Sequence, residues 1–560
     1  MFLILSFLWF IRETKVILFY LYLWQLKEYR IPRFLDYFRT EKGKKLLLNK
    51  LVIFKVFLLV IWIAMEYISV GFGFFDMIHD FILIFSVVML FVVYFFEGIR
   101  AVSNYISGKF LKPVFTRKIQ FLIFILLSFT IALLLFMILS FKRPLVGLLA
   151  FDILTPLIVS AIIFIFQPLA ILGKNQIFKK AKEKRAEFKD LLVIGITGSY
   201  GKTSTKEFLA TILAEKFNLL KTQEHQNTEI GVSQCILNDL QPEHKIFICE
   251  MGAYKRGEIK LLANIAKPKI GVITGINEQH LATFGSQENI IKGKYELIES
   301  LPDDGLAIFN GDNKYCLELY KKTLIEKRIY GLQSSISRAI AKGKEEDLSS
   351  SLSGKPPDIW AHNVRTEKDF IIFKIYSKDD SADFKVNVLG AQNVLNILGA
   401  AVVAKELGMG LEEIARACQK IEPQQGGMQL KKGINELNII DATYSANPDG
   451  LISHLEYLKI WPQKKVIIMP CLIELGKASK EVHKRIGQKI GEVCDLSIIT
   501  TKERFKEIKE GTGEKAIFLE NPKEIFEKIK SFCREGDVVL LESRVPGELI
   551  KKLTIDNQCQ

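Results

Sequence analysis

The residues best suited to chemistry lie near position 200, in a glycine-containing run that ends in lysine and threonine. This run is Thr197-Gly198-Ser199-Tyr200-Gly201-Lys202-Thr203. Its glycines allow the backbone to turn N–H groups inward, and Lys202 neutralises phosphate charge. Thr203 supplies a hydroxyl that can bind magnesium. The run therefore predicts a phosphate-binding loop.

The sequence on either side of this run supports the prediction. Residues 191–196 are apolar and rich in β-branched side chains, which predicts a strand, and a helical pattern starts at Thr203. The general phosphate-loop pattern has a further glycine where this chain has Ile196, so a chance Gly-Lys-Thr match is the alternative. A strand, a glycine loop and a helix in that order favour nucleotide binding.

Two further strands lead to residues that could bind a metal ion. An apolar strand over 246–249 ends at Glu250, and a strand over 270–273 precedes His280 and Lys294. A hard cation such as magnesium prefers oxygen ligands, which an acid at a strand end provides. A lone histidine is more often structural, but its place after the third strand of the same sheet favours a site.

The order of these motifs resembles the Mur ligase family, and within it the MurF type, which joins D-alanyl-D-alanine to the muramoyl tripeptide. The motifs that carry the resemblance are the run from Thr197 to Ser204, Asn227-Thr228-x-x-Gly231, Glu250-Met251-Gly252, His280 with Lys294, the run from Gly390 to Asn396, the run from Asp441 to Asp449, and Glu474-Leu475-Gly476 with His483. Each motif is weak alone, but the ordered set is specific. It covers residues 190–560.

The resemblance implies an ATP-dependent ligase that makes an amide through an acyl phosphate. It implies catalytic roles for Lys202, Lys294, His280 and Asn227. The nucleotide would contact Gly198, Ser199, Gly201, Lys202, Thr203, Ser204, Asn396 near adenine, and Asp441 near the ribose or phosphates. One magnesium ion would be held by Thr203 and Glu250, and a second by His280 and a carbamylated Lys294. The implied substrates are a muramoyl-peptide precursor and an amino acid or dipeptide.

Three positions depart from the family pattern. Gln392 replaces a histidine, Ala442 replaces an acid, and Gly427 stands where the family supplies an arginine to the phosphates. The loss of such an arginine can cost orders of magnitude in rate. Either Lys431 or Lys432, which lie close by in the sequence, substitutes for it, or the enzyme is altered.

Apolar residues are concentrated before position 173, although they make up 49% of the whole 560-residue chain. Four runs are long enough to cross about 30 Å of hydrocarbon: 51–72, 80–99, 120–141 and 146–172. A fifth run, 1–25, contains Arg12, Glu13 and Lys15, so its status as a span stays open. It lacks the basic start and the small-residue cleavage site of a signal peptide.

The net charge of +14 is explained by the loops between these runs. Basic residues cluster in 26–50, in 101–119 and after 172, which places those segments in the cytoplasm. We therefore expect a multi-pass protein of the bacterial inner membrane, with membrane lipid and proteins of cell-wall synthesis as partners. Nucleic-acid binding would need basic residues interleaved with aromatic residues along a soluble face, and the sequence shows no such stripe. Eight cysteines without a Cys-x-x-Cys pair suit a reducing cytosol.

Four acidic residues fall in or beside the apolar runs, where an ionisable group is a candidate functional residue. We expect Glu66, Asp76 and Glu97 to lie near membrane interfaces. Asp152 lies deeper in its run, and its role stays open.

The predicted fold class is an α-helical transmembrane region, then an α/β P-loop ATPase domain, then a Rossmann-like α/β domain. The expected boundaries are 1–175, 176–420 including a helical linker over 390–418, and 421–560. Within the ATPase domain, 355–388 predicts a small β excursion. In the last domain, strands are predicted at 437–441, 465–470, 496–500, 516–519 and 537–541. Helical stretches alternate with them, as in a Rossmann-like sheet.

Three functions remain open on the sequence. The first is a MurF-like ligase at the membrane surface. The second is a ligase for a lipid-linked cell-wall precursor, because the family's UDP-sugar-binding domain has no room before the phosphate loop. The third is a membrane scaffold that binds nucleotide without turnover, which the glycine at 427 would suit.

Overall fold

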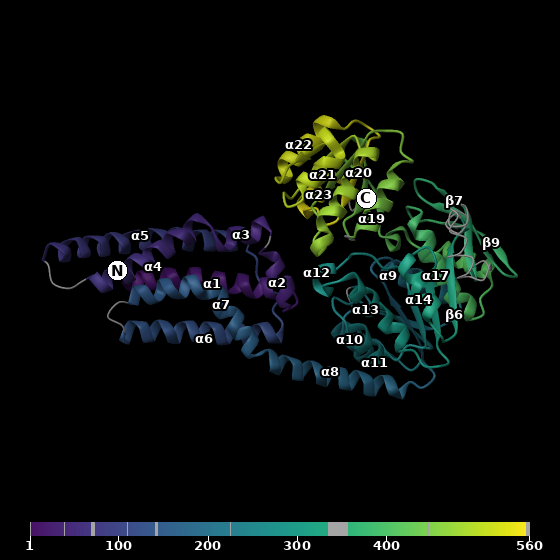
Figure 1. The fold of residues 1–560 in the computed structure, drawn as a ribbon, viewed down its shortest axis with the longest axis horizontal. Coiled ribbons are helices and arrows are strands. Elements are labelled where there is room, and N and C mark those ends of the chain that lie inside the picture. Colours follow the sequence, from purple (N-terminus) through teal and green to yellow (C-terminus); the bar gives the residue numbers. More distant parts are fainter. Residues whose placement is uncertain are drawn as a thin grey trace. The chain divides into compact units, whose positions relative to one another are not determined.

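The computed structural model describes residues 2–38, 40–68, 73–108, 110–140, 144–224, 226–333, 357–444 and 447–555. The chain forms two compact units, Met1–Asn175 and Gln176–Gln560 (Figure 1). The predicted fold class is confirmed, because apolar helices come first and two α/β domains follow.

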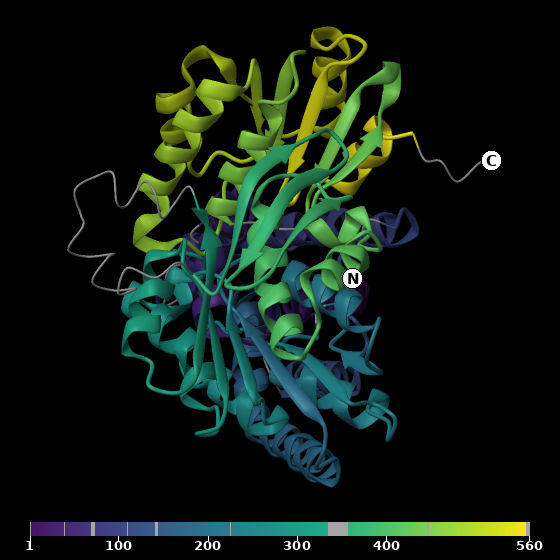
Figure 2. The same ribbon diagram turned by 90° about the vertical axis from the view of Figure 1, so that its right-hand side faces the viewer.

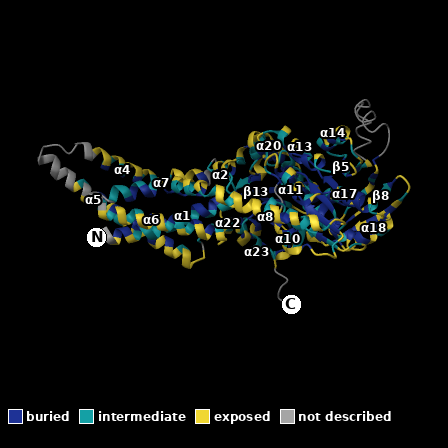
Figure 3. Cartoon of the chain, turned by 90° about the horizontal axis from the view of Figure 1, so that it is seen from below, coloured by how far each residue is buried: buried dark blue, intermediate teal, exposed yellow. Residues whose placement is uncertain are grey.

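The first unit is helical. Its helices are α1 (Phe2–Leu26), α2 (Ile31–Tyr37), α3 (Glu41–Leu47), α4 (Lys50–Ile68), α5 (Gly73–Ile106), α6 (Arg117–Ser140), α7 (Pro144–Ile165) and α8 (Gln167–Glu187), which continues into the second unit. Four stretches of the described residues are long and apolar enough to cross a membrane: Gly43–Ala64, Ile84–Ile106, Arg117–Leu139 and Leu145–Ile165. Large apolar side chains such as Phe96, Phe124 and Leu139 are exposed on these helices (Figure 3). That pattern suits a lipid environment rather than water.

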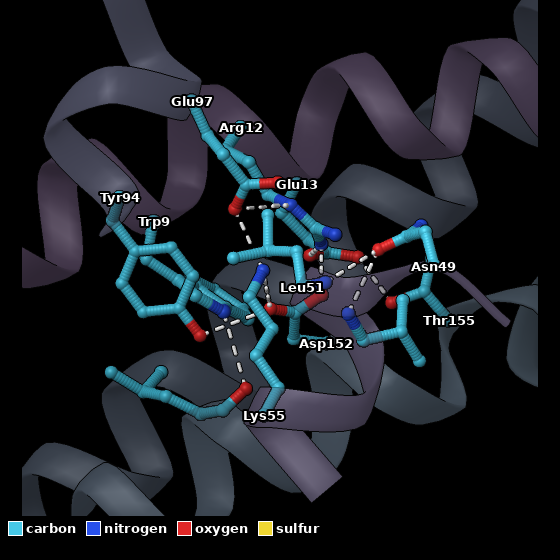
Figure 4. Close-up of polar contacts among 12 residues, drawn as sticks. Trp9, Arg12, Glu13, Asn49, Leu51, Lys55, Tyr94, Glu97, Asp152 and Thr155 are labelled. Carbon is cyan, nitrogen blue, oxygen red and sulfur yellow. Dashed lines mark hydrogen bonds and ion pairs between the residues drawn. The ribbon is translucent and has the colours of Figure 1, made fainter. Parts of the chain in front are cut away.

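Five charged side chains from four helices meet inside this unit, and we call them the charge cluster: Arg12, Glu13, Lys55, Glu97 and Asp152 (Figure 4). The Arg12 guanidinium pairs with Glu13 at 2.7 Å, with Glu97 at 3.4 Å and with Asp152. The Lys55 ammonium lies 2.7 Å from both Glu97 and Asp152. Charges buried among apolar helices persist only when they are paired in this way.

Two neutral side chains complete the charge cluster. The Tyr94 hydroxyl donates to Asp152 at 3.0 Å, and the Thr155 hydroxyl donates to Glu13. Glu97 was expected near a membrane interface, but it lies near the middle of the stretch Ile84–Ile106, where two cations neutralise it. The side chains of Glu66 and Asp76 lie outside the described part of the chain.

The second unit begins with a nine-stranded sheet in the order β2-β3-β1-β4-β5-β6-β7-β8-β9 (Figure 2). Its strands are β1 (Leu192–Thr197), β2 (Leu219–Lys221), β3 (Ile246–Glu250), β4 (Ile270–Ile273), β5 (Leu306–Asn310), β6 (Lys327–Leu332), β7 (Ile359–Thr366), β8 (Ile371–Ser377) and β9 (Ser381–Val386). Strands β1 to β7 are parallel to one another, β8 pairs antiparallel with β7, and β9 pairs antiparallel with β8. The β excursion expected over 355–388 therefore extends the main sheet, because β7 pairs directly with β6.

Helices cover both faces of this sheet, and each face has its own apolar core. They are α9 (Lys202–Leu213), α10 (Glu229–Asp239), α11 (Glu258–Ala266), α12 (Leu281–Phe284), α13 (Gln287–Glu299), α14 (Lys314–Lys322), α17 (Gln392–Glu406) and α18 (Leu411–Cys418). The segment expected to be a helical linker, 390–418, forms α17 and α18. Both helices contribute buried residues to the same core as α9, so they belong to this domain.

A six-stranded sheet follows, in the order β10-β11-β15-β12-β13-β14. Its strands are β10 (Gln429–Lys432), β11 (Asn438–Ala442), β12 (Lys465–Met469), β13 (Leu496–Ile499), β14 (Ala516–Phe518) and β15 (Val538–Glu542). Its helices are α19 (Pro448–Leu458), α20 (Ser479–Val493), α21 (Phe505–Thr512), α22 (Pro522–Phe532) and α23 (Gly547–Leu553). Only β10 runs antiparallel, so the remaining strands form a parallel, Rossmann-like sheet.

Candidate active site

The phosphate loop joins β1 to α9 in a backbone conformation that requires glycine. Gly201 has φ 76° and forms the N-cap of α9, and Gly198 has φ 153°. A Cβ atom at Gly198 would collide with Thr274, and one at Gly201 with the Asn396 side chain. Left-handed backbone and close neighbours both select glycine, which has no Cβ. The loop amides and the N-terminus of α9 are thus arranged for an anion.

Three predicted residues meet at the end of β3, which pairs with β1 so that Glu250 lies beside Ile196. The Thr203 hydroxyl donates to Glu250 Oε2 at 3.0 Å, and the Asn227 amide donates to Glu250 Oε1 at 2.9 Å. A carboxylate and a hydroxyl are oxygen donors of the kind that magnesium binds, usually together with substrate phosphates and water. The donor set therefore fits a magnesium ion bound beside the phosphate loop.

Lys206 was missed in the sequence, although it is close to this carboxylate. It follows Lys202 by four residues on α9, and its side chain is 1% exposed. The ammonium lies 3.7 Å from Glu250 and 3.0 Å from Glu207, and it donates to the Thr222 carbonyl at 2.8 Å. Its positive charge therefore compensates the buried Glu250. The spacing of one helical turn from Lys202 was the signal that could have revealed it.

Two lysines at the site have no carboxylate within ion-pair distance among the described residues. Lys202 makes only a 3.5 Å contact with the Ser199 carbonyl, and Lys294 on α13 is 2% exposed, 5.8 Å from the centre of the Phe284 ring. Burial, and after it the charge of Lys202, lower the pKa of Lys294 to about 7. Burial also lowers the pKa of Lys202. Both ammonium groups are suited to an anionic partner.

His280 follows β4 and is the N-cap of α12, with φ 63°. Its Nδ1 atom lies 2.7 Å from Oε2 of Glu474, which belongs to the last domain. The centre of its ring lies 4.5 Å from the centre of the Tyr254 ring, in an edge-to-face arrangement. Burial lowers the pKa of His280, and the charges of Lys294 and Lys202 act in the same direction, whereas Glu474 opposes them. A carboxylate of the last domain therefore contacts the Nδ1 side of this imidazole.

Asn277 makes a second connection between the two domains. Its side-chain amide donates to Asp449 at 2.9 Å, and its backbone N–H donates to the Ser199 hydroxyl at 3.2 Å. Ser199 is 3% exposed, so this part of the loop is enclosed. The last domain therefore reaches the segment that supports the phosphate loop.

The two predicted nucleotide contacts outside the loop lie in different surroundings. Asn396 lies beside Gly201, accepts from the Thr205 hydroxyl at 3.5 Å and donates to Asn393 at 3.0 Å. Asp441 lies at the end of β11, 2.6 Å from the Lys431 ammonium. Burial alone would raise the pKa of Asp441, but Lys431 and Thr443 outweigh burial and hold this pKa below its usual value.

The unusual glycine at 427 lies close to the phosphate loop. It has φ 83°, and a Cβ atom there would have only Ser204 within 4.0 Å. A side chain at this position would therefore point toward the first turn of α9, but the left-handed backbone disfavours any residue except glycine. Lys431, one suggested substitute for the family arginine, is already paired with Asp441.

The fold and the site together define a P-loop nucleotide-binding protein with a second, Rossmann-like domain. Residues 196–404 match the Mur ligase middle domain, and residues 426–544 match the Mur ligase glutamate ligase domain. The UDP-N-acetylmuramoyl-tripeptide--D-alanyl-D-alanine ligase of Mycobacterium leprae is 30% identical over 383 residues, which are 63% of this chain and 71% of that protein. The chain belongs to the Mur ligase family, as its motifs suggested.

Solved structures share the same fold. A MurF structure from Acinetobacter baumannii matches with a TM-score of 0.59 and 23% identity, over 68% of this chain and 81% of that one. The MurF ligase of Thermotoga maritima in complex with ADP matches with a TM-score of 0.57 and 26% identity, over 68% and 83%. The UDP-N-acetylmuramoyl-tripeptide--D-alanyl-D-alanine ligase of Synechocystis is 30% identical over 53% of this chain. The match spans only 59% of the length of that ligase. Both family matches begin after the helical unit.

Proposed function

We propose that this protein is an ATP-dependent ligase that forms an amide bond in peptidoglycan precursor synthesis. The proposed reaction is the MurF-like addition of D-alanyl-D-alanine to a muramoyl peptide. The observation that carries the proposal is the combination of Thr203 and Glu250, which are oxygen donors, with the buried amino groups of Lys202 and Lys294, which have no carboxylate within ion-pair distance among the described residues. This arrangement suits a nucleotide phosphate and its magnesium ion.

The residues of the chain contribute positioning and charge neutralisation. A carboxylate is a poor acyl donor, so ATP first phosphorylates it, and the incoming amine then displaces phosphate from the acyl phosphate. In this proposal the loop amides and Lys202 hold the transferred phosphoryl group. Asn227, whose side-chain amide donates to Glu250 at 2.9 Å, would lie beside the γ-phosphate. Magnesium, when bound by Thr203 and Glu250, neutralises charge on the phosphate oxygens.

The remaining nucleotide contacts follow from the same site. Asn396, which touches the loop at Gly201, is proposed to reach the adenine, and Asp441 the ribose or phosphates. Closure of the last domain over the nucleotide would bring Asp441 into place.

A second magnesium site is proposed at His280 and Lys294. The pKa of Lys294, lowered to about 7, leaves a large share of neutral amine at neutral pH. A neutral amine can attack carbon dioxide and release one proton, which yields a carbamate with oxygen donors. Among the described residues no group of three or more His, Cys, Asp or Glu side chains gathers as a metal site. A carbamylated lysine would supply the missing oxygens, which suit a hard cation.

The test is ATP-dependent release of phosphate by the purified full chain in detergent. Release that requires both UDP-muramoyl tripeptide and D-alanyl-D-alanine supports the MurF-like reaction. Intact ATP binding without release, for every acceptor offered, would overturn the ligase proposal and favour a nucleotide-binding scaffold.

A lipid-linked acceptor is the second candidate, and the helical unit favours it. Four apolar helices occupy the part of the chain that precedes both family matches. We propose that they lie in the inner membrane with the ligase domains in the cytoplasm, and that membrane lipid and cell-wall synthesis proteins are partners there. Phosphate release with a polyprenyl-linked precursor, but not with the UDP-linked one, would support this candidate.

A further inference from the structure

The contact between His280 and Glu474 joins two segments that are far apart in the sequence. The His280 Nδ1 atom lies 2.7 Å from Glu474 Oε2, and the backbone N–H of Ala282 donates to the Glu474 carbonyl at 3.0 Å. Glu474 follows β12 of the last domain, and His280 follows β4 of the ATPase domain. The side chain and the backbone of Glu474 thus both hold the segment that carries His280.

Both residues adopt a backbone conformation that non-glycine residues rarely take. His280 has φ 63° and Glu474 has φ 64°. Such conformations are strained for residues with a Cβ atom and persist where the surrounding structure imposes them. Local bonds impose the one at His280: the Gln279 N–H donates to the Asn277 side chain at 2.9 Å, and Leu281 N–H donates to Glu278. Two such conformations on facing segments indicate a contact with a function.

The chemistry of the pair determines which imidazole nitrogen is available. A carboxylate at Nδ1 accepts the Nδ1–H bond, so the lone pair of the neutral ring lies on Nε2. Metal-bound histidines commonly donate their other N–H to a carboxylate, which fixes the tautomer and the ring orientation.

We propose that Glu474 is a positioning residue that orients His280 for magnesium and thereby makes the metal site depend on the approach of the last domain. This inference rests on the proposed role of His280 as a metal ligand. Because Glu474 comes from the other domain, His280 is fully oriented only when the two domains are in contact. By thermodynamic reciprocity, metal binding then favours the closed arrangement of the domains.

The test measures metal binding separately from turnover. Mn²⁺, which electron paramagnetic resonance detects, replaces Mg²⁺ in the full chain with a non-hydrolysable ATP analogue and bicarbonate. Loss of a metal-orienting partner typically weakens affinity about 10- to 100-fold, so we expect that loss at one of two Mn²⁺ sites in Glu474→Ala. Glu474→Gln keeps an acceptor for Nδ1–H, and we expect most of the affinity to return.

A matched control separates positioning from simple domain contact. Arg485 makes a weak ion pair with Glu278 at 3.9 Å, which also joins the two domains but does not touch His280. Arg485→Ala should leave both Mn²⁺ affinities unchanged. A fluorescence-transfer pair on α13 and α20 should report closure on metal addition in wild type and in Arg485→Ala, but not in Glu474→Ala.

Two outcomes distinguish failure of this inference from failure of the proposed function. If His280→Ala removes a Mn²⁺ site but Glu474→Ala leaves its affinity and the closure signal intact, the positioning role is wrong while the metal site stands. If His280→Ala changes no Mn²⁺ site, the proposed second metal site itself is wrong.

Discussion

The charge cluster and the phosphate-loop region both contain buried positive charges, but their pairing differs. In the charge cluster, Arg12 and Lys55 are each within ion-pair distance of two or three carboxylates. At the phosphate loop, Lys202 and Lys294 have no carboxylate at that distance among the described residues. A paired charge maintains the fold, whereas an unpaired one near a helix N-terminus is prepared for an anionic ligand.

This difference predicts opposite consequences of removing a charge. Loss of a paired cation leaves a buried carboxylate uncompensated, so stability falls. Loss of an unpaired cation removes a desolvation cost, so stability is kept while ligand binding or turnover falls. Substitutions that remove one charge from each region therefore test this difference.

Lys202→Ala should reduce ATP-dependent phosphate release by about 1000-fold or more, the scale of groups that neutralise phosphoryl charge in the transition state. The thermal unfolding midpoint of the soluble domains should not fall, because no ion pair is lost. Phosphate release and thermal unfolding on the same preparation check both parts. Unchanged turnover would contradict the phosphate-loop assignment.

Arg12→Leu should destabilise the helical unit by about 3–5 kcal/mol, the usual cost of removing one partner of a buried ion pair. Glu13, which is fully buried, would keep only its bond from Thr155. Thermal unfolding in detergent measures the loss. The double variant Arg12→Leu/Glu13→Leu should recover most of it, since both charges are gone.

Lys15→Leu is the matched control for Arg12→Leu. Lys15 also lies on α1, but it forms no ion pair with any described residue. We expect no loss of stability. Equal destabilisation by both substitutions would show that the pairing of Arg12 is not what maintains the unit.

Lys294→Ala should lower turnover by about 100-fold, a typical scale for a lost charge-stabilising group in a dry site. Short-chain carboxylates should restore part of the activity, because they replace the carbamate oxygens. The measurement is phosphate release with and without added acetate or formate. Full activity without rescue would remove the carbamate proposal.

Lys294 should also produce a pH dependence of stability in carbon dioxide-free buffer. Its folded pKa is lowered to about 7 from an ordinary value of 10.5. The unfolded state then binds more protons between these values, so the free energy of unfolding rises from pH 7 toward pH 10.5. Lys294→Met should have a shallower rise, measured by denaturant unfolding at several pH values. Parallel curves for the two proteins would show that Lys294 keeps an ordinary pKa.

The sequence predicted the parts of the site that depend on local order. The phosphate loop, Glu250 and the helix that carries Lys294 follow from short patterns of strand, loop and helix. The link from His280 to Glu474 spans 194 residues, so no local pattern could reveal it. Lys206 was missed because a lysine within a helix usually faces water, whereas Glu250 and Glu207 make its burial favourable here.

The arrangement of elements was harder to predict than their existence. Residues 390–418 were expected to be a linker, but α17 contributes small buried residues such as Gly399 and Ala400 to a shared core. Glu97 was expected at an interface, and its pairing with Arg12 and Lys55 could not be foreseen, because those cations lie on other helices. In both cases the position of the segment depends on contacts with residues far away in the sequence. The hydrophobic periodicity of a single segment carries no information about such contacts.

The phosphate loop is held from outside by several neighbours that do not belong to it. The Ser199 N–H donates to the Gly275 carbonyl at 2.7 Å, the Thr274 hydroxyl donates to the Tyr200 carbonyl, and Asn396 lies against Gly201. A loop fixed in this way gives up little conformational entropy when a nucleotide enters. Nucleotide affinity should then depend mainly on electrostatic attraction, so the residence time of ADP should shorten as ionic strength rises.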